Sequence, residues 1–177
     1  MKQLVQDKYF KVITVENSDS ADILLYGVIG QEKWWDDDPT EPITDMELVK
    51  TIRELEAKYD KINIRINSPG GSMYHGNSIN TVMQSSTSEI HTWNDGLAAS
   101  MAADIWLAGK HRHMAKNALM MIHAPSSWVW GTAKEMRQEA DVLDKFEQTA
   151  IVVMAEATGM SEEDVKKEYY DYEDHWF

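Results

Sequence analysis

The chain has 177 residues, of which 43% are hydrophobic, so it is long enough to form a domain with a hydrophobic core. Its formal net charge of −13 argues against nucleic acid and anionic membrane surfaces as partners, because both attract basic proteins. The absence of cysteine excludes disulfides and thiolate chemistry. Because the sequence also has no long apolar run, we expect a cytoplasmic protein that does not bind membranes.

The N-terminal part alternates strands and helices. We expect strands at residues 10–15 and 23–30, then a loop at 31–42 whose acidic patch is solvated. A capping box at 44–47 opens a helix that continues to Tyr59. A strand at 62–67 precedes a Gly70-Gly71 turn and a helix at 74–84. A strand at 90–93 then leads through a small-residue turn at 96–101 to a helix at 102–108.

The C-terminal part continues the alternation. We expect a turn and strand at 114–118, a strand at 119–123, a helix from the capping box at 132–135 to about Ala157, and a helix at 161–169. Short joins between strands and helices predict βαβ units and a mostly parallel sheet, the α/β class, in one domain covering residues 1–177. The apolar stripe of the long helix, flanked by Trp128 and Trp130, predicts a homo-oligomer.

Ser100 is the candidate nucleophile. It stands among small residues directly before a helix, where a hydroxyl would be exposed near the positive end of the helix dipole. By itself this pattern fits an N-cap serine on an ordinary helix even better. The backbone N–H groups of the Gly70-Gly71 turn and of Met101 are candidate donors to an oxyanion, with a simple structural turn as the alternative for the glycines.

His123 is the candidate general base, because it follows an apolar strand at the end where α/β sheets place their sites. A structural role is the alternative for this histidine. Asp171 and Asp174 lie in an acidic, aromatic tail, and either could orient the His123 ring if it is not merely solvated. His111 and His113 would share a strand face, but with no carboxylate or third histidine nearby we assign them to a surface hairpin. The remaining histidines are expected to be structural: His75, His91 and His175.

Three segments match one known family in the same order, INSPGGS at 66–72, GLAASM at 96–101 and MIHAP at 121–125. Over about residues 23–177 the sequence resembles ClpP, the proteolytic subunit of the Clp protease. The resemblance implies a ClpP/crotonase-like spiral of βαβ units, with the helix at 132–157 as a handle in a homo-oligomeric ring. It also implies a serine endopeptidase that cleaves polypeptides through an acyl-enzyme and needs no cofactor or metal.

The same resemblance implies a role for each candidate residue. Ser100 is the nucleophile and His123 the general base, while the N–H groups of Gly71 and Met101 form the oxyanion hole. Asp174 matches the carboxylate of the family's final Asp-x-aromatic step, so it takes the orienting role. The sequence leaves Asp171 open as the alternative, and it does not show whether an ATPase partner exists.

Some features depart from ClpP. Residues 1–22 do not resemble the axial segment that meets an unfoldase, and they resemble instead the leading strand of ClpP-like phage head-maturation proteases, as do residues 34–38 and 93–100. We therefore expect a phage or prophage prohead protease that acts on capsid or scaffold protein in the host cytoplasm. ClpP relatives continue beyond Phe177 into a further helix and strand, which predicts a truncated C-terminal end. The alternatives are a crotonase-type acyl-CoA enzyme and an inactive structural ring subunit of the same fold.

Overall fold

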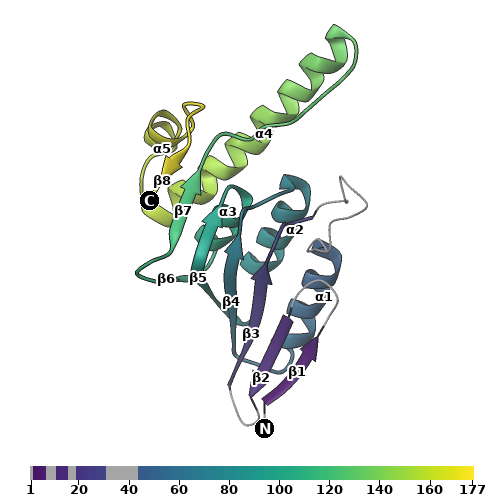
Figure 1. The fold of residues 1–177 in the computed structure, drawn as a ribbon, viewed down its shortest axis with the longest axis vertical. Coiled ribbons are helices and arrows are strands. Elements are labelled where there is room, and N and C mark those ends of the chain that lie inside the picture. Colours follow the sequence, from purple (N-terminus) through teal and green to yellow (C-terminus); the bar gives the residue numbers. More distant parts are fainter. Residues whose placement is uncertain (1, 7–10, 16–18, 31–43) are drawn as a thin grey trace. The chain divides into compact units, whose positions relative to one another are not determined.

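The computed structural model describes residues 2–6, 11–15, 19–30 and 44–177 (Figure 1). The chain divides into two compact units, Met1–Met120 and Met121–Phe177, and each is described here by itself. The predicted acidic loop at 31–42 lies outside the described residues, as does Phe10 of the first predicted strand.

The first unit is a sheet with helices on one side (Figure 1). Its strands run in the spatial order β1 to β5, with β6 beside β5. β1 and β2 precede β3 and pair antiparallel, whereas the pairs β3–β4, β4–β5 and β5–β6 are parallel. The predicted α/β class with a mostly parallel sheet is thus confirmed. The strands are β1 (Lys2–Gln6), β2 (Lys11–Val15), β3 (Ser20–Tyr26), β4 (Lys61–Ser68), β5 (Glu89–Ala99) and β6 (His111–Met114).

Alternation along the strands separates an apolar face from a polar one. From position 62 to 66, every second residue of β4 is a fully buried isoleucine, and these side chains belong to one hydrophobic core. Three helices contribute to that core: α1 (Asp45–Glu56), α2 (Met73–Gln84) and α3 (Met101–Leu107). In α1 the buried residues are Leu48, Ile52 and Leu55, whose spacing keeps one helix face apolar. Burial of each large aliphatic side chain contributes about 1.5–3 kcal/mol.

The other face of the sheet carries polar and aromatic side chains. Arg65 on β4 donates from Nε and Nη2 to the two carboxylate oxygens of Asp95 on β5, at 2.8 and 2.6 Å. Tyr26 donates its hydroxyl to the same carboxylate at 2.8 Å, and the Arg65 guanidinium lies 5.3 Å from the centre of the Trp93 ring. These contacts connect β3, β4 and β5 on the face opposite the core.

β5 extends further than the sequence predicts. The small-residue stretch at 96–99 belongs to this strand, so only Ser100 separates the strand from α3. Asn94 explains the difference: its buried side chain donates to the Leu119 carbonyl at 2.8 Å and accepts from the Gly96 N–H at 3.2 Å. The β4–β5 register shifts at this point, between Ile66 and Ser68. A buried amide therefore holds the irregular strand where the glycine suggested a turn.

Two further sequence predictions about local structure are wrong. His111 and His113 lie on β6, which runs parallel to β5, and not in a hairpin. Thr44 is the N-cap residue of α1 but makes no capping hydrogen bond, because its hydroxyl donates instead to the Glu47 carboxylate at 3.4 Å. The capping box between Thr132 and Glu135 does form.

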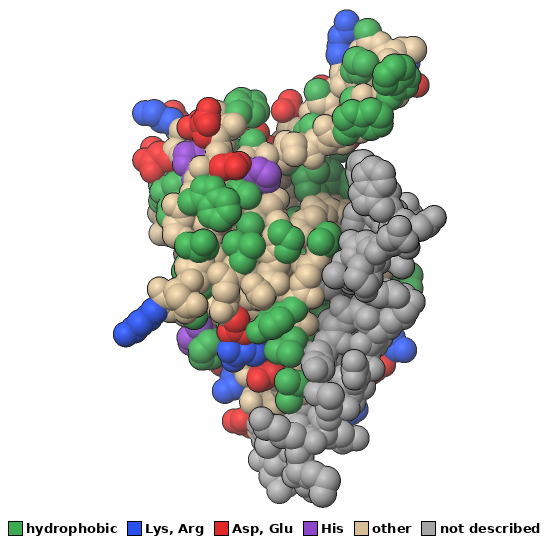
Figure 2. Space-filling model, viewed as in Figure 1, with side chains coloured by type: hydrophobic (Ala, Val, Ile, Leu, Met, Phe, Trp, Pro, Cys, Tyr) green, Lys and Arg blue, Asp and Glu red, His purple; other side chains and the backbone are tan. Residues whose placement is uncertain are grey.

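The second unit contains two helices and a short antiparallel strand pair. β7 (Leu119–Ile122) leads into this unit and pairs with β8 (His175–Trp176). The helices are α4 (Ala133–Thr158), which ends at Gly159 with φ 77°, and α5 (Glu162–Tyr169). Lys166 of α5 donates to the buried carboxylate of Glu147 on α4 at 2.9 Å. Figure 2 shows hydrophobic side chains gathered at the N-terminal end of α4. In the described ranges no helix combines the length and the apolar character needed to cross a bilayer.

Candidate active site

Ser100 occupies the sharp junction between β5 and α3. Its φ of 54° and ψ of −130° lie in a region that residues other than glycine rarely adopt, at a cost of about 1–3 kcal/mol. Although Ser100 is the N-cap residue of α3, its side chain makes no capping hydrogen bond, so the ordinary N-cap interpretation does not explain it. In nucleophile elbows, a strained strand-to-helix turn of this kind exposes the serine hydroxyl.

The turn after β4 packs directly against this junction. Gly70 has φ +98°, and a Cβ atom placed on it would lie 2.6 Å from the Ala99 carbonyl oxygen and 2.8 Å from the Ser100 Cβ. The same atom would lie 3.1 Å from the Met101 backbone nitrogen. Only glycine allows both this conformation and this close approach, so the glycine turn and the serine junction form one tightly fitted structure.

The predicted oxyanion donors come from these two touching segments. Ile29 forms a parallel bridge around Gly71: its N–H donates to the Gly70 carbonyl at 2.9 Å, and its carbonyl accepts from the Ser72 N–H at 2.8 Å. The N–H of Gly71 itself takes no part in this pairing. Met101 is the first residue of α3, where N–H groups lack partners within the helix. Its side chain is buried, so the backbone is the part of Met101 that can meet a substrate.

The second unit places Asp174 opposite His123. The antiparallel register pairs Ile122 with His175, so the next residues along, His123 and Asp174, face each other. Nδ1 of His123 lies 3.4 Å from Oδ1 of Asp174. Contacts between catalytic groups are often this long before substrate binds and shorten in the complex. With Nδ1 directed to the carboxylate, Nε2 is the atom that can accept a proton.

Asp171, the alternative carboxylate, contacts a different histidine. Its Oδ1 accepts from Nε2 of His175 at 2.7 Å and from the Glu173 N–H at 3.1 Å. The hydrogen bond from His175 lowers the pKa of Asp171. These contacts favour Asp174 over Asp171 as the partner of His123.

The candidate residues thus form two groups. Ser100, Gly71 and Met101 lie together in the first unit, and His123 lies beside Asp174 in the second. The first group offers a nucleophile with N–H donors nearby, and the second offers a base with an orienting carboxylate. Residue types alone did not reveal the strained backbone of Ser100, because serine seldom adopts a positive φ.

Known proteins share the central and C-terminal sequence of this chain. The family model for Clp protease matches residues 40–177. The chain belongs to the Clp protease family. It is 35% identical over 119 residues to the ATP-dependent Clp protease proteolytic subunit 3 of Streptomyces coelicolor, and 36% identical over 118 residues to proteolytic subunit 2 of Corynebacterium efficiens. It is also 36% identical over 117 residues to proteolytic subunit 1 of Prochlorococcus marinus.

These matches cover part of each protein. They include 66%, 66% and 65% of this chain, and 54%, 58% and 60% of the three relatives, in the same order. The chain thus spans little more than half the length of the curated relatives it matches. The family match and the mostly parallel sheet together agree with the predicted ClpP-like α/β fold.

Proposed function

We propose that this chain is a serine endopeptidase of the ClpP class, in which the two units form one peptidase domain. Ser100 attacks the carbonyl carbon of a peptide bond and passes its proton to Nε2 of His123. The N–H groups of Gly71 and Met101 donate to the oxyanion that forms, and Asp174 stabilises the charged imidazole ring. His123 then protonates the leaving amine, and water hydrolyses the acyl-enzyme.

The strained backbone of Ser100 is the observation that carries this proposal. A serine that served only as a helix cap would have the ordinary extended conformation, as Ser161 has with φ −71° and ψ 149° at the start of α5, where its side chain accepts from the Asp164 N–H. Ser100 adopts φ 54° instead, and the Gly70-Gly71 turn is fitted against it. Strain that the surrounding structure enforces is typical of catalytic positions.

A fluorophosphonate probe tests the nucleophile. Intact-mass spectrometry is expected to show one adduct per chain in the natural protein and none in Ser100→Ala. Ser72→Ala is the matched control, because Ser72 is also the N-cap residue of a helix that follows a strand, and it is expected to label normally. Peptide hydrolysis is expected to fall by several orders of magnitude in Ser100→Ala. Equal labelling of Ser100→Ala and the natural protein would refute the proposal.

We propose Asp174, and not Asp171, as the residue that positions His123. Asp174→Asn is expected to lower kcat by up to about 10⁴-fold, because an amide can hold the imidazole in the wrong tautomer. Asp171→Asn breaks the contact with His175 and is expected to leave kcat within a few-fold of the natural value. The reverse order would transfer the role to Asp171. Normal kcat in both variants would show that the site works as a Ser-His pair.

We propose further that the protein assembles into a homo-oligomeric ring through the region around α4. Trp128 and Trp130 before this helix are 77% and 87% exposed in the single chain, and Met136 in its first turn is also exposed. Large apolar side chains exposed together in one region are typical of an interface. Light scattering is expected to give several times the chain mass of 20.3 kDa, and Trp130→Ser to lower that mass. A monomer at high concentration would contradict the assembly.

The substrate is a polypeptide, and we propose head maturation in a phage or prophage as the setting. Residues 93–100 support this role through their resemblance to prohead proteases, and β1 and β2 lie outside the range that the family model matches. Portal and capsid genes beside this gene, and cleavage of that capsid or scaffold protein by the natural protein but not by Ser100→Ala, are the expected results. A gene neighbourhood without capsid genes would argue for a different substrate.

A further inference from the structure

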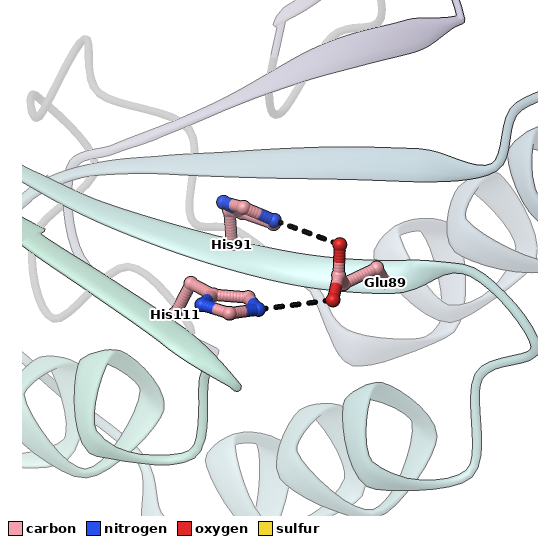
Figure 3. A group of neighbouring side chains, drawn as sticks. All are labelled: Glu89, His91 and His111. Carbon is pink, nitrogen blue, oxygen red and sulfur yellow. Dashed lines mark hydrogen bonds and ion pairs between the residues drawn. The ribbon is translucent and has the colours of Figure 1, made fainter.

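Two neighbouring strands of the first unit bring a carboxylate and two imidazoles together. Glu89 and His91 are two residues apart on β5, so their side chains share one face of the sheet. The parallel register of β5 and β6 places His111 directly beside His91. This is the face opposite the hydrophobic core, which includes Ile90. Figure 3 shows the Glu89 carboxylate turned towards both rings.

The contacts in this group are short and use the same atom of each ring. Nε2 of His111 lies 2.9 Å from Oε1 of Glu89, and Nε2 of His91 lies 3.3 Å from Oε2. One ligand atom from each of the three residues lies within 4.8 Å of the other two. The His91 and His111 rings are stacked, with centroids 4.5 Å apart. Glu89 and His111 are partly exposed, so an ion can reach the group from solvent.

We propose that Glu89, His91 and His111 bind a divalent transition-metal ion, with Zn²⁺ as the best fit. Two imidazoles and one carboxylate are a donor set that zinc accepts, with water as a fourth ligand. With zinc–ligand bonds of about 2.0–2.2 Å in a tetrahedral site, two ligand atoms lie about 3.4 Å apart. The carboxylate–imidazole contacts of 2.9 and 3.3 Å need only small side-chain rotations to reach that spacing.

Neighbouring side chains support the same atoms as ligands. His113 follows on the same face of β6, and its Nε2 lies 3.4 Å from Nδ1 of His91. In the proposed site Nδ1–H of His91 donates to Nε2 of His113, and this tautomer leaves Nε2 of His91 free to bind a metal. The His113 ring is itself held by stacking on Trp93, at 3.8 Å between centroids.

The position of this group separates it from the proposed protease chemistry. Glu89 is the first residue of β5 and Ser100 follows the last, so roughly 35 Å of strand lies between them. An ion bound here would not contact the peptide bond. It would join β5 to β6, a strand of only four residues, and so stabilise the first unit.

Zinc titration of the natural protein tests the site. We expect one Zn²⁺ per chain, with the affinity lowered at least tenfold in Glu89→Gln and in His111→Ala. Lys110→Gln is expected to tighten binding, because Lys110 competes for Oε1 of Glu89 from 3.1 Å. His75→Ala is the matched control: His75 also contacts a carboxylate, Asp45 at 2.8 Å, and it should bind zinc as the natural protein does.

Two further readouts identify the ligands and exclude other sites. Bound Co²⁺ is expected to give the intense visible absorption of four-coordinate cobalt, and this absorption should be lost in His111→Ala. Saturating Zn²⁺ is expected to raise the Tm of the natural protein and of His75→Ala, but not that of Glu89→Gln or His111→Ala. No binding at high micromolar Zn²⁺, or binding that survives both Glu89→Gln and His111→Ala, would overturn the proposal. The second result would point to the carboxylate–histidine pairs at 123 and 174 or at 171 and 175.

Discussion

Gly70→Ala tests the close fit between the glycine turn and the Ser100 junction. The added methyl group would lie 2.6 Å from the Ala99 carbonyl oxygen and 2.8 Å from the Ser100 Cβ. Both distances are too short for non-bonded atoms, and neither atom can rotate away, because one is a backbone oxygen and the position of the other, a Cβ, is fixed by the Ser100 backbone. The Ser100 junction must therefore shift, and with it the hydroxyl and the Met101 N–H.

The expected cost has two parts. An alanine at φ +98° costs about 1–2 kcal/mol in backbone strain, and crowding in a packed site costs about 1–3 kcal/mol more. The sum of about 2–5 kcal/mol corresponds to a Tm lowered by about 5–15 °C for a chain of this length. Displacement of the nucleophile by even 1 Å is expected to lower kcat by about a hundredfold.

Gly27→Ala separates strain from crowding. Gly27 has φ +120°, but a Cβ atom there would meet no atom within 4 Å. This variant is therefore expected to lose about 1–2 kcal/mol and to keep its peptidase activity. Thermal unfolding and peptide hydrolysis of both variants make the comparison. Equal losses of stability and activity in Gly70→Ala and Gly27→Ala would refute the close fit at Ser100.

Two more predictions concern stability. The free energy of unfolding of Ser100→Gly is expected to be about 1–2 kcal/mol higher than that of Ser100→Ala, because glycine accepts φ 54° without strain. Equal free energies of unfolding would show that the junction is not strained. Burial raises the pKa of Asp104 in α3 to about 7, so its favourable contribution to folding is present near pH 4 and is lost as the pH rises through 7. In urea unfolding, Asp104→Asn should therefore match the natural protein near pH 4 and exceed its stability near pH 8, and a gain that is equal at both pH values would contradict this cause.

Much of the fold is predictable because its elements have strong local signals. The isoleucines at 62, 64 and 66 mark a buried parallel strand, and the Thr132–Glu135 capping box and Gly159 mark the ends of α4. The end of β5 is not predictable in this way, because Asn94 holds it through contacts with Leu119, which lies 25 residues away. β8 cannot be predicted from the sequence either, because a strand of two residues has no periodicity.

The candidate site shows the same division between local and distant information. Ser100, Gly71 and Met101 stand in short motifs, so the sequence alone points to them. The sequence alone does not point to Glu89, His91 and His111 as a group, because Glu89 and His111 become neighbours only through the β5–β6 register. A hairpin at His111 would have no carboxylate nearby, whereas the parallel strand β6 brings His111 beside Glu89.

The rate at which a fluorophosphonate labels Ser100, with and without His123, tests the central claim most directly. The claim is that Ser100 of the first unit and His123 of the second act as one nucleophile and base. In His123→Asn the labelling rate constant is predicted to fall by about a hundredfold or more, while His175→Asn labels at the natural rate. Labelling of His123→Asn at the natural rate would contradict the claim, because Ser100 would then react without His123 as its base.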